Sequence, residues 1–414
     1  MKDFTFVDLF CGIGGFHQAM AGLGGRCVFA CDIDRHCRET YYNNYGIRPA
    51  EDITRIDEHD VPGHDVLCGG FPCQAFSKAG KRLGFDDPTK GTLFFDVMRI
   101  VRAKRPQYVL LENVRNLASH DGGNTWRTIR ESLAGAGYDV TEQPIIFSPH
   151  WLGIPQHRER VFIMAVCTDT GTLPRFCFNT KRIPACSIKN VLEPIDSVSE
   201  KYLLSFDELA LFQQWNLFLH YTRTSDGRLP GFPIWTEYFR DDATVDESMP
   251  KWKQAIVRKN IDYYRTNRKF IDTWLPKARE TRLFFGAKAK LEWQAGVDVS
   301  EPRILDYIIQ YRPSGIRVKP ATYFPALVAM DQHSIIGPEV RYMTPRECAR
   351  IQSFPDDFII DESDSQAYKQ FGNSVNVDVV RLFARFLLGD ADIRREYSYE
   401  NQYGTQQIIQ DTLL

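Results

Sequence analysis

The sequence of 414 residues lacks the features that mark membrane, secreted and strongly basic proteins. It contains no apolar run of the roughly 20 residues needed to cross a bilayer, and residues 1–6 lead into a predicted strand without a signal peptide. The ten cysteines have no regular paired spacing, which indicates reduced thiols and a cytoplasmic protein. The formal net charge is −2, so any affinity for nucleic acid must come from local basic patches.

The sequence also lacks two ligand-binding motifs, one for a metal ion and one for a dinucleotide. Cys27, Cys31 and Cys37 fall in a strand–loop–helix pattern without the close pairs of a zinc module, so no metal site is expected. The glycine turn at residues 11–15 lacks the full G-x-G-x-x-G spacing, which argues against a dinucleotide. The hydrophobic content of 43% and charged content of 25% are ordinary for globular proteins, and the length predicts two domains.

The N-terminal residues read as the cofactor-binding opening of a doubly wound α/β sheet. A strand over 4–10 is followed by the glycine turn and a helix over 16–23. A second strand, 27–31, ends at Asp32, where a carboxylate is placed to accept hydrogen bonds from ribose hydroxyls. The alternative is that Asp32 caps a helix beginning near Arg35. We favour ribose binding because the turn and the acid occur together.

A single cysteine follows the next predicted strand. The apolar run 65–68 leads to Pro72, whose ring fixes the backbone just before Cys73. On its own, a lone cysteine such as Cys73 is more often a small buried hydrophobic residue than a nucleophile. Residues 78–91 are rich in glycine and cations, as expected of a loop that closes over an anionic partner.

A carboxylate and two arginines follow the later strands. Glu112 comes directly after the apolar run 108–111, where burial is costly unless it has a partner or a function. An ion pair with Arg115 is the structural alternative. Arg158 and Arg160 alternate on an extended segment and so point to one side, which suits a planar acceptor or phosphates.

Six short blocks follow one another along the sequence: 8–15 (DLFCGIGG), 70–74 (GFPCQ), 112–114 (ENV), 156–160 (QHRER), 344–350 (TPRECAR) and 370–375 (QFGNSV). Taken together and in this order, they resemble the C5-cytosine DNA methyltransferases, in particular bacterial enzymes of the restriction-modification type. The resemblance implies a SAM-dependent methyltransferase fold, which is a doubly wound, mostly parallel α/β sheet, with a second, smaller target-recognition domain.

The resemblance implies methyl transfer from S-adenosylmethionine to carbon 5 of a cytosine flipped out of duplex DNA. Cys73 would add to carbon 6, Glu112 would act at ring N3, and Arg158 and Arg160 would grip the base and order the site. Some family members carry an aromatic residue at the position of Ile33. The implied cofactor-binding residues are Phe10, Gly12, Gly14, Asp32, Ile33, Asp52, Pro72, Leu93, Asn373 and Val375.

The polar interval between about 180 and 340 corresponds to the family's variable recognition region. Apolar residues from Trp252 to Trp274 recur at steps of four and seven, which predicts a long helix with one apolar side. Residues 251–290 hold twelve cations and three acids; a solvated helix face is the alternative, but this local excess favours a phosphate-contacting surface. Residues 310–319 are expected to form a loop facing a DNA groove. The predicted DNA contacts are Gln74, Ser77, Lys78, Lys81, Arg82, Lys259, Arg265, Arg268 and Lys269.

These patterns predict a monomeric, site-specific DNA cytosine-5 methyltransferase acting on double-stranded DNA in the bacterial nucleoid, with a possible restriction endonuclease acting separately. The alternatives are an RNA methyltransferase of the same fold and a non-catalytic DNA-binding homologue. The expected catalytic domain is 1–178 and 366–395, the recognition domain 179–345, the hinge 346–365 and the polar tail 396–414.

Overall fold

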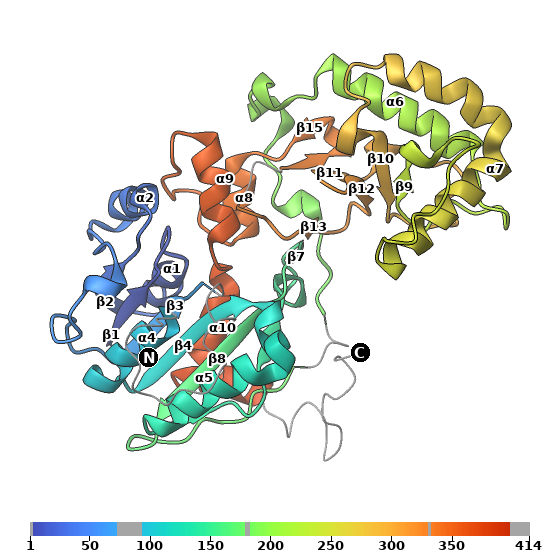
Figure 1. Ribbon diagram of the computed structural model, residues 1–414. Helices are drawn as coiled ribbons and strands as arrows, with labels where there is room; N and C mark the ends of the chain where they lie inside the picture. The colour runs from blue at the N-terminus through green and yellow to red at the C-terminus, as the bar shows by residue number, and fades with distance from the viewer. Residues whose placement is uncertain (1–2, 73–92, 179–182, 330–332, 398–414) are drawn as a thin grey trace. The chain divides into compact units, whose positions relative to one another are not determined.

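The computed structural model describes residues 3–72, 93–178, 183–329 and 333–397. The chain forms two compact units (Figure 1). Unit 1 comprises Met1–Cys186, Ala326–Ala329 and Cys348–Leu414, and unit 2 comprises Ser187–Pro325 and Met330–Glu347. Of the predicted hinge, 346–365, residues 346–347 belong to unit 2 and residues 348–365 belong to unit 1. Within the described residues, no helix is long and apolar enough to cross a membrane.

Unit 1 is built on a seven-stranded sheet in the order β2-β1-β3-β4-β8-β5, with β6 paired to β8. Strands β2, β1, β3 and β4 are parallel, whereas β8, β5 and β6 run antiparallel. The predicted α/β fold is confirmed. The strands of this sheet are β1 (Phe4–Leu9), β2 (Gly25–Cys31), β3 (Val66–Gly70), β4 (Tyr108–Val114), β5 (Tyr138–Val140), β6 (Ile145–Phe147) and β8 (Arg160–Cys167); the short strand β7 (Gln156–His157) lies outside it.

Helices cover both faces of this sheet. Apolar residues of α4 and α5 join one core cluster with side chains of β1, β3, β4 and β8. On the other face α10 packs on β4 and β8 and contacts α1 (Figure 1); Phe383 of α10 stacks on Phe162 of β8. The helices are α1 (Gly15–Ala21), α2 (Arg35–Tyr45), α4 (Leu93–Lys104), α5 (Asn124–Gly135), α8 (Pro345–Ile351), α9 (Asp364–Asn373), α10 (Val377–Leu387) and α11 (Ala391–Glu396).

Unit 2 is a two-layer structure in which α6 and α7 cover one face of a six-stranded sheet (Figure 1). Aromatic and aliphatic side chains of both helices share a core with inward-facing strand residues. The elements are α6 (Phe206–Tyr221), β9 (Ile234–Trp235), α7 (Lys251–Glu280), β10 (Lys290–Trp293), β11 (Ile308–Arg312), β12 (Gly315–Lys319), β13 (Phe324–Pro325), β14 (Ser334–Ile336) and β15 (Arg341–Tyr342), and the sheet order is β15-β14-β11-β12-β10-β9.

Two sequence predictions for unit 2 are wrong in detail. The long helix exists as α7, but Trp252, expected on its apolar side, is 65% exposed. This residue lies in the first turn, ahead of Val257, which is the first buried residue of the helix. The segment 310–319 is not a loop but most of a β-hairpin, with β11 and β12 paired antiparallel from Ile308 to Lys319.

Candidate active site

The glycine turn after β1 has an unusual backbone. Phe10 adopts a left-handed conformation with φ of 54°, which is uncommon for a bulky residue and is typical of functional sites. Gly12 and Gly14 also have positive φ, and a Cβ at Gly14 would lie 2.3 Å from the ring of Tyr45. The turn therefore requires glycine at position 14 for both its conformation and its packing.

Asp32 connects this turn to the end of β2 through hydrogen bonds. Its carboxylate accepts hydrogen bonds from the backbone N–H of Gly12 at 2.7 Å and of Asp34 at 2.8 Å. Burial raises the pKa of Asp32, against the opposing effect of these two bonds. The helix-cap alternative for Asp32 is wrong, because the N-cap of α2 is Asp34, which accepts from His36 and Cys37.

The other predicted cofactor-binding residues near Asp32 lie at the same edge of the sheet. Ile33, between the two aspartates, is 75% exposed, which leaves its side chain open to a ligand. The backbone N–H of Asp32 donates to the carbonyl of Ala50 and draws the segment before Asp52 alongside β2. The Asp52 carboxylate is partly engaged, because it accepts from Thr54 and caps a short 3₁₀ helix.

Residues from distant parts of the chain complete this region. Val375 packs so closely on α1 that a Cβ at Gly15 would lie 2.6 Å from its Cγ2 atom. Leu93, at the start of α4, and Phe10 pack against the same core cluster. Pro72 and Asn373 are exposed. The turn lies after β1, between β2 and β3, at the carboxyl edge where ligands bind in doubly wound sheets.

Glu112 lies within β4 rather than after the strand, and it pairs in register with Gly70 at the end of β3. It is 8% exposed, and its Oε1 lies 3.0 Å from Nε of Arg160. The alternative ion pair with Arg115 is wrong, because Arg115 pairs with Glu159 at 3.0 Å. Burial raises the pKa of Glu112 and outweighs the opposing effects of Arg160 and then Arg158.

Arg158 is buried, with 3% of its surface exposed, and its guanidinium binds backbone carbonyls. Nη1 donates to Leu327 at 2.8 Å, and Nη2 donates to Gly372 at 2.9 Å and Ser374 at 2.8 Å. Burial, then Arg160, lowers the pKa of Arg158 to about 9, so it stays charged at neutral pH. Arg158, two residues before β8, therefore holds the segment that carries Asn373 and Val375.

One cavity brings these polar candidates together. Glu112, Arg158 and Arg160 line it together with Phe147, Phe162 and Val375. The Glu112 carboxyl and the two guanidinium groups thus line one small cavity, and the burial of Glu112 and Arg158 makes charge interactions there stronger than in water.

Cys73 lies outside the described residues, but the strand end that leads to it is fixed. Phe71 is 3% exposed and packs against Phe94 of α4. Its carbonyl accepts a 2.7 Å hydrogen bond from Nδ2 of Asn113, the residue after Glu112. The backbone just before Pro72 and Cys73 is therefore held against the strand that carries Glu112.

Comparison with known proteins decides the family. The sequence profile described as C-5 cytosine-specific DNA methylase matches residues 4–388. The chain belongs to this family. Type II methyltransferase M.AluI of Cellulosimicrobium cellulans is 35% identical over 92% of the chain and 91% of its own length, and M.HhaI of Haemophilus parahaemolyticus is 31% identical over 93% and 94%. Among solved structures, a mutant of Spodoptera frugiperda DNMT2 superimposes with a TM-score of 0.51, and the match covers 93% of this chain and 99% of that one. The sequence identity is only 20%, so this likeness supports the fold alone.

This DNA cytosine-5 methyltransferase also has a supporting residue that the sequence did not reveal. Ser148 is fully buried, and its Oγ accepts the backbone N–H of Arg158 at 3.0 Å and lies 2.8 Å from Nδ1 of His150. A serine before a proline has no distinctive sequence signal. Its role depends on the fold, which places it beside the backbone of Arg158.

The close packing behind Arg158 gives a testable consequence at Gly372. A Cβ there would lie 2.5 Å from the backbone of Val328, which cannot move as a side-chain tip can. We therefore expect Gly372→Ala to lower the free energy of unfolding by about 1–3 kcal/mol, although alanine normally favours a helix. Thermal unfolding with a matched Gly63→Ala control tests this, since a Cβ at Gly63 meets nothing within 4 Å. Equal melting temperatures for the two variants would contradict the packing argument.

Only some of the predicted DNA-contacting residues of this methyltransferase lie within the part of the chain that the structure describes. Gln74, Ser77, Lys78, Lys81 and Arg82 lie outside the described residues. On α7, Lys259 and Lys269 are exposed, whereas two of the arginines have acidic partners. The pairs are Arg265–Asp262 at 3.6 Å, Arg268–Asp241 at 2.5 Å and Arg268–Asp272 at 3.3 Å.

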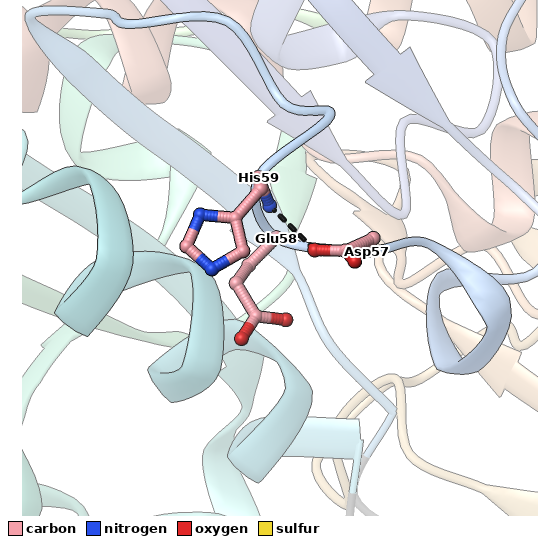
Figure 2. Close-up of side chains that lie close together, drawn as sticks. All are labelled: Asp57, Glu58 and His59. Atoms are coloured by element: carbon pink, nitrogen blue, oxygen red, sulfur yellow. Dashed lines mark hydrogen bonds between the residues drawn. The ribbon is translucent and has the colours of Figure 1, made fainter.

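One cluster of possible metal ligands occurs among the described residues, at Asp57, Glu58 and His59 (Figure 2). The backbone N–H of His59 donates to Asp57, and Glu58 is paired with Arg99 at 2.6 Å. This surface turn is stabilised by its own hydrogen bonds and by a cation, which competes with any metal. We assign it no metal.

Proposed function

We propose that this methyltransferase transfers a methyl group to carbon 5 of a flipped cytosine in double-stranded DNA through a covalent adduct between Cys73 and carbon 6. The main support is the register between β3 and β4. Gly70 pairs with Glu112, and Asn113 holds the carbonyl of Phe71. The segment entering Cys73 therefore starts beside the carboxyl that acts on the opposite part of the ring.

The residues around the glycine turn fit S-adenosylmethionine. A Cβ on Gly12 would meet no atom within 4 Å, so the turn borders open space, and Ile33 is exposed beside it. Asp32 would bind the ribose, Phe10 and Ile33 would contact the adenine, and Asp52 would contact its edge. Pro72, Leu93, Asn373 and Val375 would line the pocket, with Gly14 in the turn. When bound, this cofactor supplies the methyl group as a sulfonium electrophile.

The protein's side chains would activate the cytosine. The Cys73 thiolate adds to carbon 6 while the protonated Glu112 donates to N3, which converts the ring to an enamine with a nucleophilic carbon 5. Carbon 5 would then take the methyl group from the cofactor's sulfonium, whose methyl–sulfur bond breaks to leave a neutral thioether, and the N3 proton would return to Glu112. A base, which we take to be water, removes the carbon 5 proton, and the electrons of that bond expel the Cys73 thiolate. Arg160 orients Glu112, and Arg158 orders the surrounding backbone.

The two units would have different functions. Unit 1 would be the catalytic domain, and unit 2 the target-recognition domain. The exposed cations of α7 would attract DNA over the Debye length of about 8–10 Å. The enzyme would act as a monomer, and any restriction endonuclease of the same system would be a separate protein.

A methyl-transfer assay tests this function. Purified protein and labelled S-adenosylmethionine are incubated with duplex plasmid DNA or with tRNA, and the modified base is identified by mass spectrometry. We expect 5-methylcytosine in the DNA and at least about a hundredfold slower transfer to tRNA. Preferential transfer to tRNA, or methylation at a ring nitrogen, would overturn the proposal.

A further inference from the structure

The sheet of unit 2 has two chemically different faces. Ile309 and Val318 are cross-strand partners whose side chains join the core under α6 and α7. Since side chains alternate along a strand, Gln310 and its partner Arg317 lie on the other face. The same alternation places Arg312 and Lys319 with them, on the face that α6 and α7 do not cover. Gln310 and Glu292 of this face are buried, whereas the side chains of Arg312, Arg317 and Lys319 are half-buried and keep part of their surface exposed.

This second face has an excess of positive charge. Arg317 is paired through Nε with Glu292 of β10 at 2.7 Å. Among the described residues, neither Arg312 nor Lys319 has an ion-pair partner, so three cations share one carboxylate. Burial, then Arg317, lowers the pKa of Arg312, and burial followed by Arg317 and Arg312 lowers that of Lys319. Such crowding is unfavourable in the free protein and is relieved by an anionic partner.

A buried amide adds a second sign of an incomplete site. Gln310 is 4% exposed; its Nε2 donates to Ser334 at 3.3 Å, while its Oε1 has no partner among the described residues. A buried acceptor without a donor costs about 1–3 kcal/mol. A phosphate oxygen would not remove this cost, because it is also an acceptor; a water molecule or a donor group on a base would.

The exposed cations of α7 do not lie on the same side of the sheet as the hairpin cations. Tyr264, Ile271 and Trp274 bury one side of α7 in the core against the sheet's apolar face. The exposed cations of α7 therefore point away from the sheet, whereas Arg312, Arg317 and Lys319 lie on the sheet's far side. A duplex held against one of these surfaces cannot at the same time lie against the other.

Building on the proposed function, we propose that unit 2 binds double-stranded DNA on the outer face of its β11–β12 hairpin, through Arg312, Arg317 and Lys319. Phosphate oxygens would neutralise the unpaired cations, and the exposed tip, Pro313 and Ser314, would lie beside them. The α7 cations then act on the rate of encounter and not on the bound complex.

The test compares three double variants, each of which removes two positive charges. They are R312Q/K319Q on the hairpin face, K259Q/K269Q on α7 and R127Q/R130Q on α5 as a charge-matched surface control. Binding of a fluorescent plasmid-derived duplex containing a site that the wild-type protein methylates is measured by anisotropy between 50 and 200 mM salt. Thermal unfolding shows whether each variant is folded.

We expect R312Q/K319Q to raise Kd by at least about tenfold and to reduce the slope of log Kd against log salt by about 2. K259Q/K269Q should slow association and change Kd less than about threefold, and the α5 control should change neither. A folded R312Q/K319Q variant with wild-type Kd and salt slope, or a larger loss of affinity in K259Q/K269Q, would overturn the hairpin assignment while leaving the methyltransferase function intact. If the wild-type protein methylates no duplex DNA, the proposed function itself fails.

Discussion

Cys73→Ser should reduce methyl transfer to duplex DNA by at least about a thousandfold, because loss of a covalent nucleophile typically removes most of an enzyme's rate. A serine hydroxyl ionises far less readily than a thiol, so little alkoxide is available to add to carbon 6. Affinity for the same duplex should change by less than about threefold, since phosphate contacts supply most of the binding free energy. Single-turnover methylation and anisotropy on one protein preparation separate the two effects.

Cys186→Ser is the matched control for this prediction. Cys186 is a half-buried free thiol at the end of the first segment of unit 1, and it has no role in the proposed chemistry. Its substitution should leave the rate within about threefold of wild type, as for most substitutions outside an active site. Substantial turnover by Cys73→Ser would exclude the covalent route.

Glu112→Gln should lower the single-turnover rate by about 10²–10⁴-fold, the usual contribution of a general acid. Glutamine can donate a hydrogen bond to N3 but cannot transfer a proton. Because the proposed active form of Glu112 is protonated and burial raises its pKa, the wild-type rate should fall as pH rises through that pKa, whereas ionisation of the Cys73 thiol only raises the rate with pH. The glutamine variant should lack this decline.

Glu159→Gln provides the control, because Glu159 pairs with Arg115 and lies outside the cavity around Glu112. Its pH–rate profile should match that of the wild-type protein. If Glu112→Gln keeps both the wild-type rate and the decline at high pH, another group must act at N3.

The parts of the site that could be predicted from sequence are those set by local chemistry. The glycines after β1 and the apolar strands encode the sheet and its turn directly. The sequence predicts Glu112, Arg158 and Arg160 as residues of one site, and all three line one cavity. Such residues stand out because a charged side chain beside a buried strand is costly without a function.

The parts that could not be predicted depend on long-range contacts or on where a helix begins. The carbonyls that bind Arg158 belong to residues 214 and 216 positions away, and a backbone carbonyl has no residue signature. Asp32 and Asp34 are both plausible caps until the start of α2 is known. The spacing at Trp252 fits the helical period, but burial also requires a packing partner at that turn.

The most direct measurement of the proposed chemistry uses duplex DNA in which the target cytosine carries fluorine at carbon 5. Fluorine cannot leave as a cation, so the final elimination is blocked and the cysteine adduct persists. We expect mass spectrometry of the digested complex to find the nucleotide, carrying the transferred methyl group, attached to the peptide that contains Cys73. Methylation of normal DNA at full rate, together with no adduct at Cys73 on the fluorinated duplex, would contradict the covalent mechanism.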